Sequence, residues 1–340
     1  MDYQKYTIAT LGSHSALQIL HGAKSENFKT LLITTPEREK FYKRFSFIDE
    51  VKIIKTFADF PTVEHELKDK NVIIIPHGSF VAYLGVEKNK SMALPYFGNK
   101  AVLDWEQDRE KQQKWLTDAR IEMPPQYKSI NDVGEKDFPI IVKTFGAAGG
   151  SGYFMARFKN EFKEKIEKIR AEKYIIQKYI LGVTLYIHYF YSSLTNNLEV
   201  LSMDRRYETN ADALGRIPDY LLADPTIEPS FVVVGNSPLV LRESMLPEAY
   251  DMGERLVASS KKLINNKGIF GPFCIETIIT PDMKFYTIEI SARIVAGTNM
   301  FTNGSPYAIF HHEKSLSTGQ RIAMEIKQAI SNNRLELILD

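Results

Sequence analysis

The sequence contains a single cysteine, no long hydrophobic run and almost no net charge. Cys274 alone cannot form an intramolecular disulfide, and its apolar neighbours indicate a buried core thiol. No apolar run approaches the roughly 20 residues that span a bilayer, and the first residues lack the apolar segment of a signal peptide. We therefore expect a cytoplasmic protein without a membrane partner. The formal net charge of +1 gives no basic field, so we expect no nucleic-acid partner.

The N-terminal third alternates short apolar strands with helical segments. At 340 residues the chain is long enough for two or three domains. Continuous Val, Ile and Leu runs are typical of parallel strands buried on both faces. We therefore predict an α/β domain with a Rossmann-like parallel sheet over residues 1–122. Its predicted strands lie at residues 6–11, 30–34, 50–54 and 72–76.

Two polar loops follow the first and the fourth of these strands. They read Gly12-Ser13-His14-Ser15 and His77-Gly78-Ser79-Phe80. Ligands of parallel sheets bind beyond the carboxyl ends of the strands, where helix N-termini attract anions. The two loops indicate a pocket for a phosphate or a carboxylate. The alternative is that their serines only cap helices.

A strongly charged segment separates this domain from the next. Residues 104–120 carry Trp105 and Trp115 among many charged side chains, a pattern that predicts a surface helix leading out of the first domain. Pro124 and Pro125 then end the helix. We place the domain boundary there, with a second domain over residues 123–195.

The second predicted domain contains a glycine-rich hairpin. Predicted strands at residues 139–143 and 153–156 flank a loop with Gly146, Gly149 and Gly150. Backbone N–H groups in such a loop can close over phosphates, although the loop can equally be an ordinary hairpin tip.

Further on, His188 lies among aromatic residues of a predicted strand, and we interpret it as a hydrogen-bonded core residue.

The third predicted domain, residues 196–340, contains a hairpin at residues 273–293 on which two carboxylates meet. If the chain turns at Asp282 and Met283, Glu276 falls opposite Glu289, with Cβ atoms about 5 Å apart. Carboxylates this close repel each other unless a cation or a proton lies between them, which suits a hard ion such as Mg2+. The alternative is a solvated strand face. If the side chains of the second strand alternate strictly, those on one side of it are Thr287, Glu289, Ser291 and Arg293.

The order of these features resembles the ATP-grasp superfamily of carboxylate–amine ligases, in which Glu276 and Glu289 match the magnesium ligands. Distinctive strings along nearly the whole chain are similar to the archaeal formate-dependent phosphoribosylaminoimidazole-carboxamide formyl ligases, the FAICAR synthetases. These strings are Ala9–Leu20, Pro76–Phe80, Pro95–Lys100, His188–Ser192, Asp204–Glu208, Gly271–Cys274 and Val295–Asn299.

The resemblance implies an ATP-grasp enzyme of mixed α/β and α+β class that formylates an aminoimidazole-carboxamide ribonucleotide, AICAR, in purine synthesis. It implies ATP and formate as co-substrates, Mg2+ (or Mn2+) as the metal, and a homo-oligomer. Glu276 and Glu289 would bind the metal, and Lys143, Arg293 and His14 would act in catalysis. The nucleotide AICAR would contact His14, Ser79, Asn236 and Arg205. The positions matched to ATP are Lys143, Gly146, Gly149, Gly150, Gln177, Tyr179, Ile180 and Glu208.

The chain departs from the family pattern around the phosphates. Ala148 and Ser151 stand where relatives usually carry Lys or Arg, and Lys178 replaces an acidic residue. Ala101 and Asp104 likewise replace expected arginines. Fewer cations would weaken charge stabilisation during phosphoryl transfer. Two alternatives therefore stay open: a ligase for another acid and amine, and a nucleotide-binding protein without catalysis.

Overall fold

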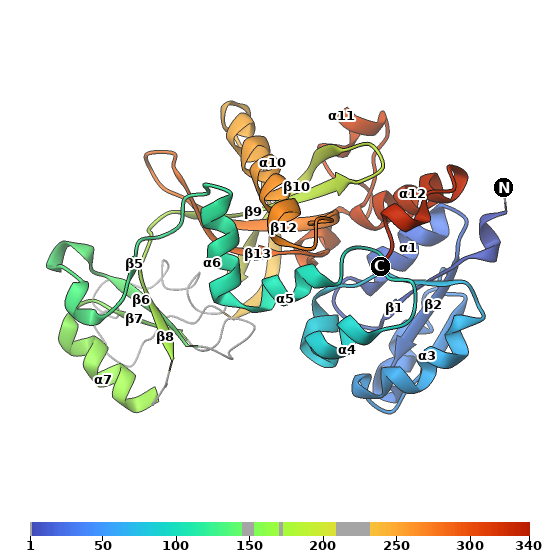
Figure 1. Cartoon of the computed structure of the whole chain (residues 1–340), viewed down its shortest axis with the longest axis horizontal. Helices are drawn as coiled ribbons and strands as arrows, with labels where there is room; N and C mark the ends of the chain where they lie inside the picture. The colour runs from blue at the N-terminus through green and yellow to red at the C-terminus, as the bar shows by residue number, and fades with distance from the viewer. Residues whose placement is uncertain (1, 145–152, 170–172, 209–231) are drawn as a thin grey trace.

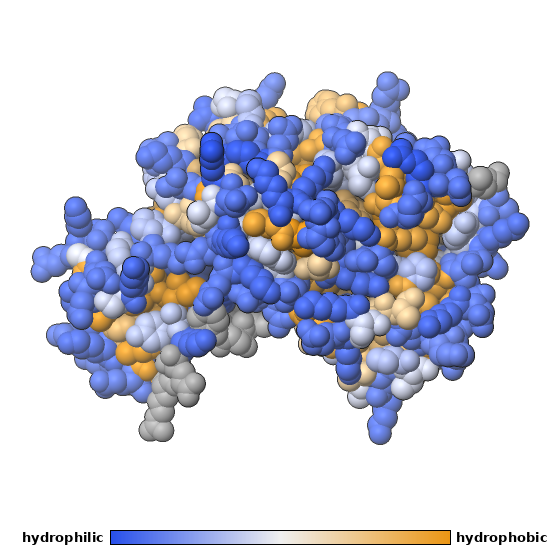
Figure 2. Space-filling model, in the orientation of Figure 1, coloured by the Kyte–Doolittle hydropathy of each residue, from blue (hydrophilic) through white to orange (hydrophobic). Residues whose placement is uncertain are grey.

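The computed structural model describes residues 2–144, 153–169, 173–208 and 232–340, which form three β-sheets with covering helices (Figure 1). The N-terminal sheet and the small sheet of the second unit lie at opposite ends of the long axis. The third sheet lies between them. None of the helices in these ranges combines the length and apolar character that crossing a membrane requires. Figure 2 shows a mainly hydrophilic face on which hydrophobic residues are scattered.

The N-terminal unit is built on a four-stranded parallel sheet of order β3-β2-β1-β4. The prediction of a parallel sheet is confirmed, because β1 pairs in parallel with β2 and β4, and β2 pairs in parallel with β3. Every residue of the central strand β1 is buried. The strands are β1 (Thr7–Leu11), β2 (Lys29–Thr34), β3 (Glu50–Ile53) and β4 (Val72–Ile74). The helices of this unit are α1 (Ala16–Ser25), α2 (Pro36–Tyr42), α3 (Phe60–Lys68) and α4 (Val86–Ser91).

The C-terminal helix α12 (Thr318–Ser331) packs on α1, so the two ends of the chain share one core (Figure 1). Two glycines permit this close crossing. A Cβ atom at Gly22 would collide with the backbone of Gly319 and Gln320, and one at Gly319 would collide with the backbone of Gln18. The close approach of the two helices therefore depends on the absence of side chains at both positions.

The charged segment forms two helices, α5 (Ala101–Gln107) and α6 (Arg109–Asp118), and the prediction of a single surface helix is wrong. Asp108 separates the helices, because its side chain accepts hydrogen bonds from the first N–H groups of α6. Trp115 is fully buried against α10 (Leu246–Leu263), and its indole N–H donates to the carbonyl of Leu256 at 3.0 Å. The many charged residues of this segment made it look fully exposed, although α6 has a buried side that includes Trp115 and Leu116.

The second unit is a small antiparallel sheet of order β5-β8-β6-β7 with a core of its own. Its strands are β5 (Gln126–Tyr127), β6 (Ile140–Thr144), β7 (Tyr153–Ala156) and β8 (Tyr174–Lys178). The pairing of β6 with β7 confirms the predicted hairpin. Helix α7 (Lys159–Ile169) covers this sheet through the buried ring of Phe162. The predicted loop residues Gly146, Gly149 and Gly150, like Ala148 and Ser151, lie outside the described residues.

The third unit is a five-stranded antiparallel sheet of order β11-β10-β9-β12-β13. Strand β9 lies between β10 and β12 in this sheet. The predicted domain boundary at residue 195 stays a prediction. Helix α10 packs on β9 and β10, and the short helix α11 (Ala308–His312) packs on β10. The strands are β9 (Val183–Ser192), β10 (Asn197–Glu208), β11 (Val233–Pro238), β12 (Gly271–Ile279) and β13 (Phe285–Ser291).

Candidate active site

Glu276 of β12 and Glu289 of β13 are directly paired across the antiparallel strands, as the sequence predicts. The Glu276 carboxylate accepts two hydrogen bonds from the Arg206 guanidinium, at 2.8 and 3.2 Å, and one from the Ser291 hydroxyl at 3.0 Å. Arg206 also lies 3.9 Å above the ring of Tyr186. A positive charge thus already balances one member of the carboxylate pair.

A bulge in this hairpin corrects one predicted detail. Glu276 pairs with Glu289 and the next residue, Thr277, pairs with Thr287, so Ile288 is the extra residue of β13. Thr277 points to the face opposite Glu276, because consecutive strand residues alternate. Its partner Thr287 therefore also lies on the face opposite Glu289, and not beside it. The bulge could not be seen in a pattern of simple alternation.

Burial and mutual repulsion set the electrostatics of the carboxylate pair. Burial, followed by the charge of Glu276, raises the pKa of Glu289 to about 7. Nearby Lys143 is 8% exposed, and burial lowers its pKa to about 8 although Glu289 opposes that shift. Two carboxylates that hold a proton in the absence of a cation are a donor set suited to a hard divalent ion.

The described residues contain no cluster of three or more Asp, Glu, His or Cys side chains that could bind a metal. Glu276 and Glu289 would therefore supply two ligands only. Mg2+ keeps few protein ligands and completes its shell with waters and substrate phosphates. The pair fits a metal that arrives with a nucleotide.

Cross-strand pairing brings further polar side chains to the same face of the sheet. Asp204, Tyr186, Glu276 and Glu289 form one row across β10, β9, β12 and β13. In the neighbouring row, Asn236 of β11 pairs with Arg206 of β10. The side chain of Asn236 and the carboxylates of Glu276 and Glu289 therefore lie on the same side of one sheet, which we call the carboxylate face.

His14 and His77 lie at the carboxyl ends of β1 and β4, where the two polar loops were predicted to meet. Their rings are stacked with centroids 5.4 Å apart. His14 has a left-handed backbone (φ 51°), and its carbonyl accepts a hydrogen bond from Asn299 at 3.1 Å. A non-glycine residue in this conformation is held by its surroundings. Ser79 is buried next to these rings, and its N–H donates to His77 Nδ1 at 3.2 Å.

Both histidines of this pair are held in the neutral form. Burial, and then the positive charge of Arg293, lowers the pKa of His14 to about 2. Burial is also the main cause that lowers the pKa of His77 to about 4, against a hydrogen bond from its Nε2–H to the carbonyl of Leu11 at 2.9 Å. The pair can therefore donate and accept hydrogen bonds without carrying charge at neutral pH.

Arg293 joins the histidine pair to the hairpin. Its guanidinium donates to Glu106 at 2.9 Å, and the same carboxylate accepts the N–H of Ala292 at 2.7 Å. Its Nε is buried and has no hydrogen-bond partner among the described residues. A Cβ atom at Gly78 would lie 2.9 Å from His14 Nε2 and 3.4 Å from Arg293 Cζ. Gly78 therefore lets these two groups approach the same point.

The remaining predicted residues lie on β8, just after β8, and on β10. Gln177 of β8 is buried, and its Oε1 has no partner among the described residues, whereas Tyr179 and Ile180 are partly buried. Glu208 ends β10. Arg205 lies on the other side of β10 from Arg206, with its guanidinium 6.0 Å from the ring centroid of Tyr207. Arg206, which was not among the predicted site residues, is the arginine that binds Glu276.

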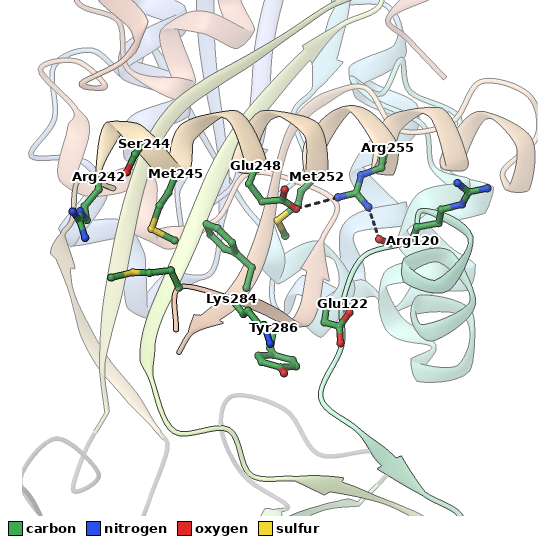
Figure 3. Close-up of a pocket in the computed structure, with 12 residues that line it drawn as sticks. Arg120, Glu122, Arg242, Ser244, Met245, Glu248, Met252, Arg255, Lys284 and Tyr286 are labelled. Carbon is green, nitrogen blue, oxygen red and sulfur yellow. Dashed lines mark hydrogen bonds and ion pairs between the residues drawn. The ribbon is translucent and has the colours of Figure 1, made fainter. Parts of the chain in front are cut away.

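A groove of about 850 Å³ lies elsewhere, between the start of α10, the tip of the β12–β13 hairpin and the segment after α6 (Figure 3). In this view Arg255 reaches from α10 to the backbone of Arg120, and it donates to Glu248 at 3.2 Å. The residues that line this groove include none of those predicted for the site. The carboxylate face, not this groove, is the candidate active site.

Comparisons with known proteins cover nearly the whole chain. Residues 8–127 match a family model described as a protein of unknown function (DUF1246), and residues 154–340 match a domain of unknown function (DUF1297). A 5-formaminoimidazole-4-carboxamide-1-(beta)-D-ribofuranosyl 5'-monophosphate synthetase of Pyrococcus horikoshii is 47% identical over 98% of this chain and 99% of its own. The relative with the same name from Saccharolobus solfataricus is 44% identical over 98% of this chain and 99% of its own.

Solved structures match the fold over a similar length. An IMP biosynthesis protein PurP from Thermococcus kodakaraensis matches with a TM-score of 0.79 and 31% identity, over 98% of this chain and 100% of its own. An N5-carboxyaminoimidazole synthetase from Staphylococcus aureus, solved with ADP, matches with a TM-score of 0.66 over 93% of this chain and 80% of its own. At 16% identity, this second likeness concerns the fold alone.

Proposed function

This chain belongs to the 5-formaminoimidazole-4-carboxamide ribonucleotide synthetase family of ATP-grasp ligases, and we propose that it formylates AICAR to FAICAR with ATP and formate. ADP and phosphate are the other products of this step in purine synthesis. The observation that carries the proposal is the opposed pair Glu276 and Glu289, which lies beside buried Lys143 in a chain 44–47% identical to synthetases over its full length.

Formate must be activated before an amine can attack it. In the proposed reaction a formate oxygen attacks the γ-phosphorus of ATP, ADP leaves, and the mixed anhydride formyl phosphate forms. The amine of AICAR then attacks the formyl carbon, loses a proton and releases phosphate. Formyl phosphate hydrolyses readily, so the site must hold the reactants together and exclude water.

Lys143 is placed to contribute to the phosphoryl transfer. It is buried beside Glu289, at the end of β6 and next to the start of the glycine-rich loop. A cation with little access to water interacts strongly with the charge on a transferring phosphoryl group. Glu276 and Glu289 would hold Mg2+, or Mn2+ in its place. Such an ion, when bound, neutralises phosphate charge.

His14, Ser79 and Asn236 would bind the aminoimidazole nucleotide, and Arg293, whose buried Nε has no hydrogen-bond partner among the described residues, would hold formate. The close approach of His14 and Arg293 at Gly78 supports this assignment, because a Cβ atom there would lie 2.9 Å from His14 Nε2 and 3.4 Å from Arg293 Cζ. A neutral His14 can hydrogen-bond a substrate without attracting its phosphate as an ion pair would. Arginine, in contrast, suits a carboxylate because its planar fork donates two parallel hydrogen bonds.

Because the glycine-rich loop lacks two cations that relatives usually carry, the test must measure turnover directly. Purified protein would be incubated with ATP, MgCl2, formate and AICAR, and with each omitted in turn. We expect ADP, phosphate and FAICAR in equal amounts, and only in the complete mixture. ADP release with a different acid or amine would favour another ligase, and nucleotide binding without ADP release would favour a non-catalytic protein. A homo-oligomer and a cytoplasmic location stay predictions.

A further inference from the structure

A fully buried carboxylate, Asp204, lies between two side chains on the carboxylate face of the central sheet. Its Oδ2 accepts a hydrogen bond from Asn236 Nδ2 at 2.6 Å, and its Oδ1 pairs with His188 Nε2 at 2.7 Å. Asp204 is 0% exposed and His188 is 1% exposed. The prediction that His188 is a hydrogen-bonded core residue is confirmed, but its partner lies directly behind a residue matched to substrate binding.

The fold holds this carboxylate tightly. Asp204 lies on β10 and pairs with Tyr186 of β9 and Pro238 of β11, so strands fix its backbone on both sides. The 3-10 helix at Ala296–Phe301 packs on β10 and β11. Within it, a Cβ atom at Gly297 would collide with the carboxylate of Asp204. The side chain therefore has no room to move away from Asn236.

These contacts determine which end of the Asn236 amide faces the site. A carboxylate only accepts hydrogen bonds, so the amide N–H₂ must turn toward Asp204. The reverse orientation would place the Asn236 carbonyl oxygen against carboxylate oxygens, with repulsion in a buried setting. His188 Nε2–H donates to the other carboxylate oxygen of Asp204. This second hydrogen bond fixes the rotation of the carboxylate, so that Oδ2 stays directed at the amide of Asn236. His188 Nδ1 is left without a partner among the described residues.

We propose that Asp204 is a positioning residue, which orients Asn236 so that its Oδ1 accepts a hydrogen bond from the reacting amine of the nucleotide. Asn236 is only partly buried, so this oxygen can be reached by a ligand. An acceptor at that point selects a nucleotide that carries an N–H donor and holds its amine in one orientation. The inference rests on the proposed function, because it takes AICAR as the ligand of Asn236.

The test compares two nucleotides and the variant Asp204→Asn. An asparagine at position 204 can donate or accept, so it no longer dictates how the Asn236 amide turns. Calorimetric titration would measure the Kd of AICAR and of imidazole-4-carboxamide ribonucleotide, which lacks the reacting amine. We expect the wild-type protein to bind AICAR more tightly than the analogue. The variant should lose about tenfold or more in affinity for AICAR, in line with one lost orienting hydrogen bond, and less than about twofold for the analogue.

Matched variants separate orientation from folding. Asn236→Ala should show the same selective loss, and Gly297→Ala, whose methyl group would displace the carboxylate of Asp204, should repeat it if Asp204→Asn does not fold. Equal losses for both nucleotides, or no loss for AICAR, would overturn the positioning role. If the wild-type protein binds AICAR no better than the analogue while it still forms FAICAR, the inference fails and the proposed function stands. Absence of AICAR binding by the wild type would overturn both.

Discussion

Glu276 and Glu289 face each other across neighbouring strands, with the guanidinium of Arg206 bound to Glu276 and the ammonium of Lys143 near Glu289. Two acids on one buried face are stable only with compensating charge. Arg206 balances one carboxylate, and the raised pKa of Glu289 means that the other can take up a proton. A divalent ion with its bound phosphates would replace that proton, which links metal binding to ATP binding.

Glu289→Gln should remove the metal site and leave the fold intact, because glutamine keeps the size of the side chain. Loss of a group that only supports a ligand costs roughly 10–100-fold in metal affinity, so loss of a ligand should cost at least that much. Manganese binding in the presence of ADP would be measured by paramagnetic resonance. Glu254→Gln, on the exposed side of α10, is the control. Equal manganese affinity in the two variants would exclude Glu289 as a ligand.

Lys143→Met should slow the chemical step more than it weakens ATP binding. The methylene stem is retained while the charge near the phosphates is lost, and removal of such a group typically costs roughly 100–1,000-fold in turnover. Turnover and the Kd of ATP would be measured separately, with Lys159→Met of exposed α7 as the control. A variant with normal turnover would assign phosphoryl transfer to other cations.

His77 should make the protein less stable as the pH falls from about 6.5 to about 4. Its pKa in the folded protein is lowered to about 4, so over this range the unfolded chain binds more protons than the folded one. The contribution is complete above pH 6.5 and is lost as the pH falls, by roughly 3 kcal/mol in total. Urea unfolding at several pH values would measure it. His77→Gln should flatten the slope, whereas an unchanged slope would assign it to other groups.

Gly22→Ala should destabilise the protein by about 1–3 kcal/mol or more, because the added methyl group meets the backbone of α12 and the helices must separate. Gly235→Ala is the matched control, since nothing described lies within 4 Å of a Cβ atom there. The free energy of unfolding in urea would be compared for both variants. Equal stability would mean that the crossing of α1 and α12 is looser than described.

Strand positions and the opposition of Glu276 and Glu289 could be predicted from the sequence, because both follow from local patterns of alternation and turn residues. Features that depend on tertiary contacts could not. The burial of Trp115 requires α10 to pack against α6, and the hydrogen-bond partner Leu256 lies 141 residues further along the chain. Arg206, not Arg205, lies on the carboxylate face because side chains two residues apart on a strand share a face, and Asp204 lies on this one. That signal was present in the sequence. The bulge at Ile288 had no such signal.

The most direct test of the account is transfer of oxygen from formate to phosphate. Protein, MgCl2, ATP, AICAR and formate labelled with ¹⁸O at both oxygens would be incubated, and the products analysed by mass spectrometry. If formate attacks ATP and the amine then displaces phosphate, each phosphate molecule released should carry one ¹⁸O atom and each FAICAR molecule should retain one. FAICAR formed together with unlabelled phosphate would contradict activation through formyl phosphate. Failure to form FAICAR in the complete mixture would contradict the proposed function itself.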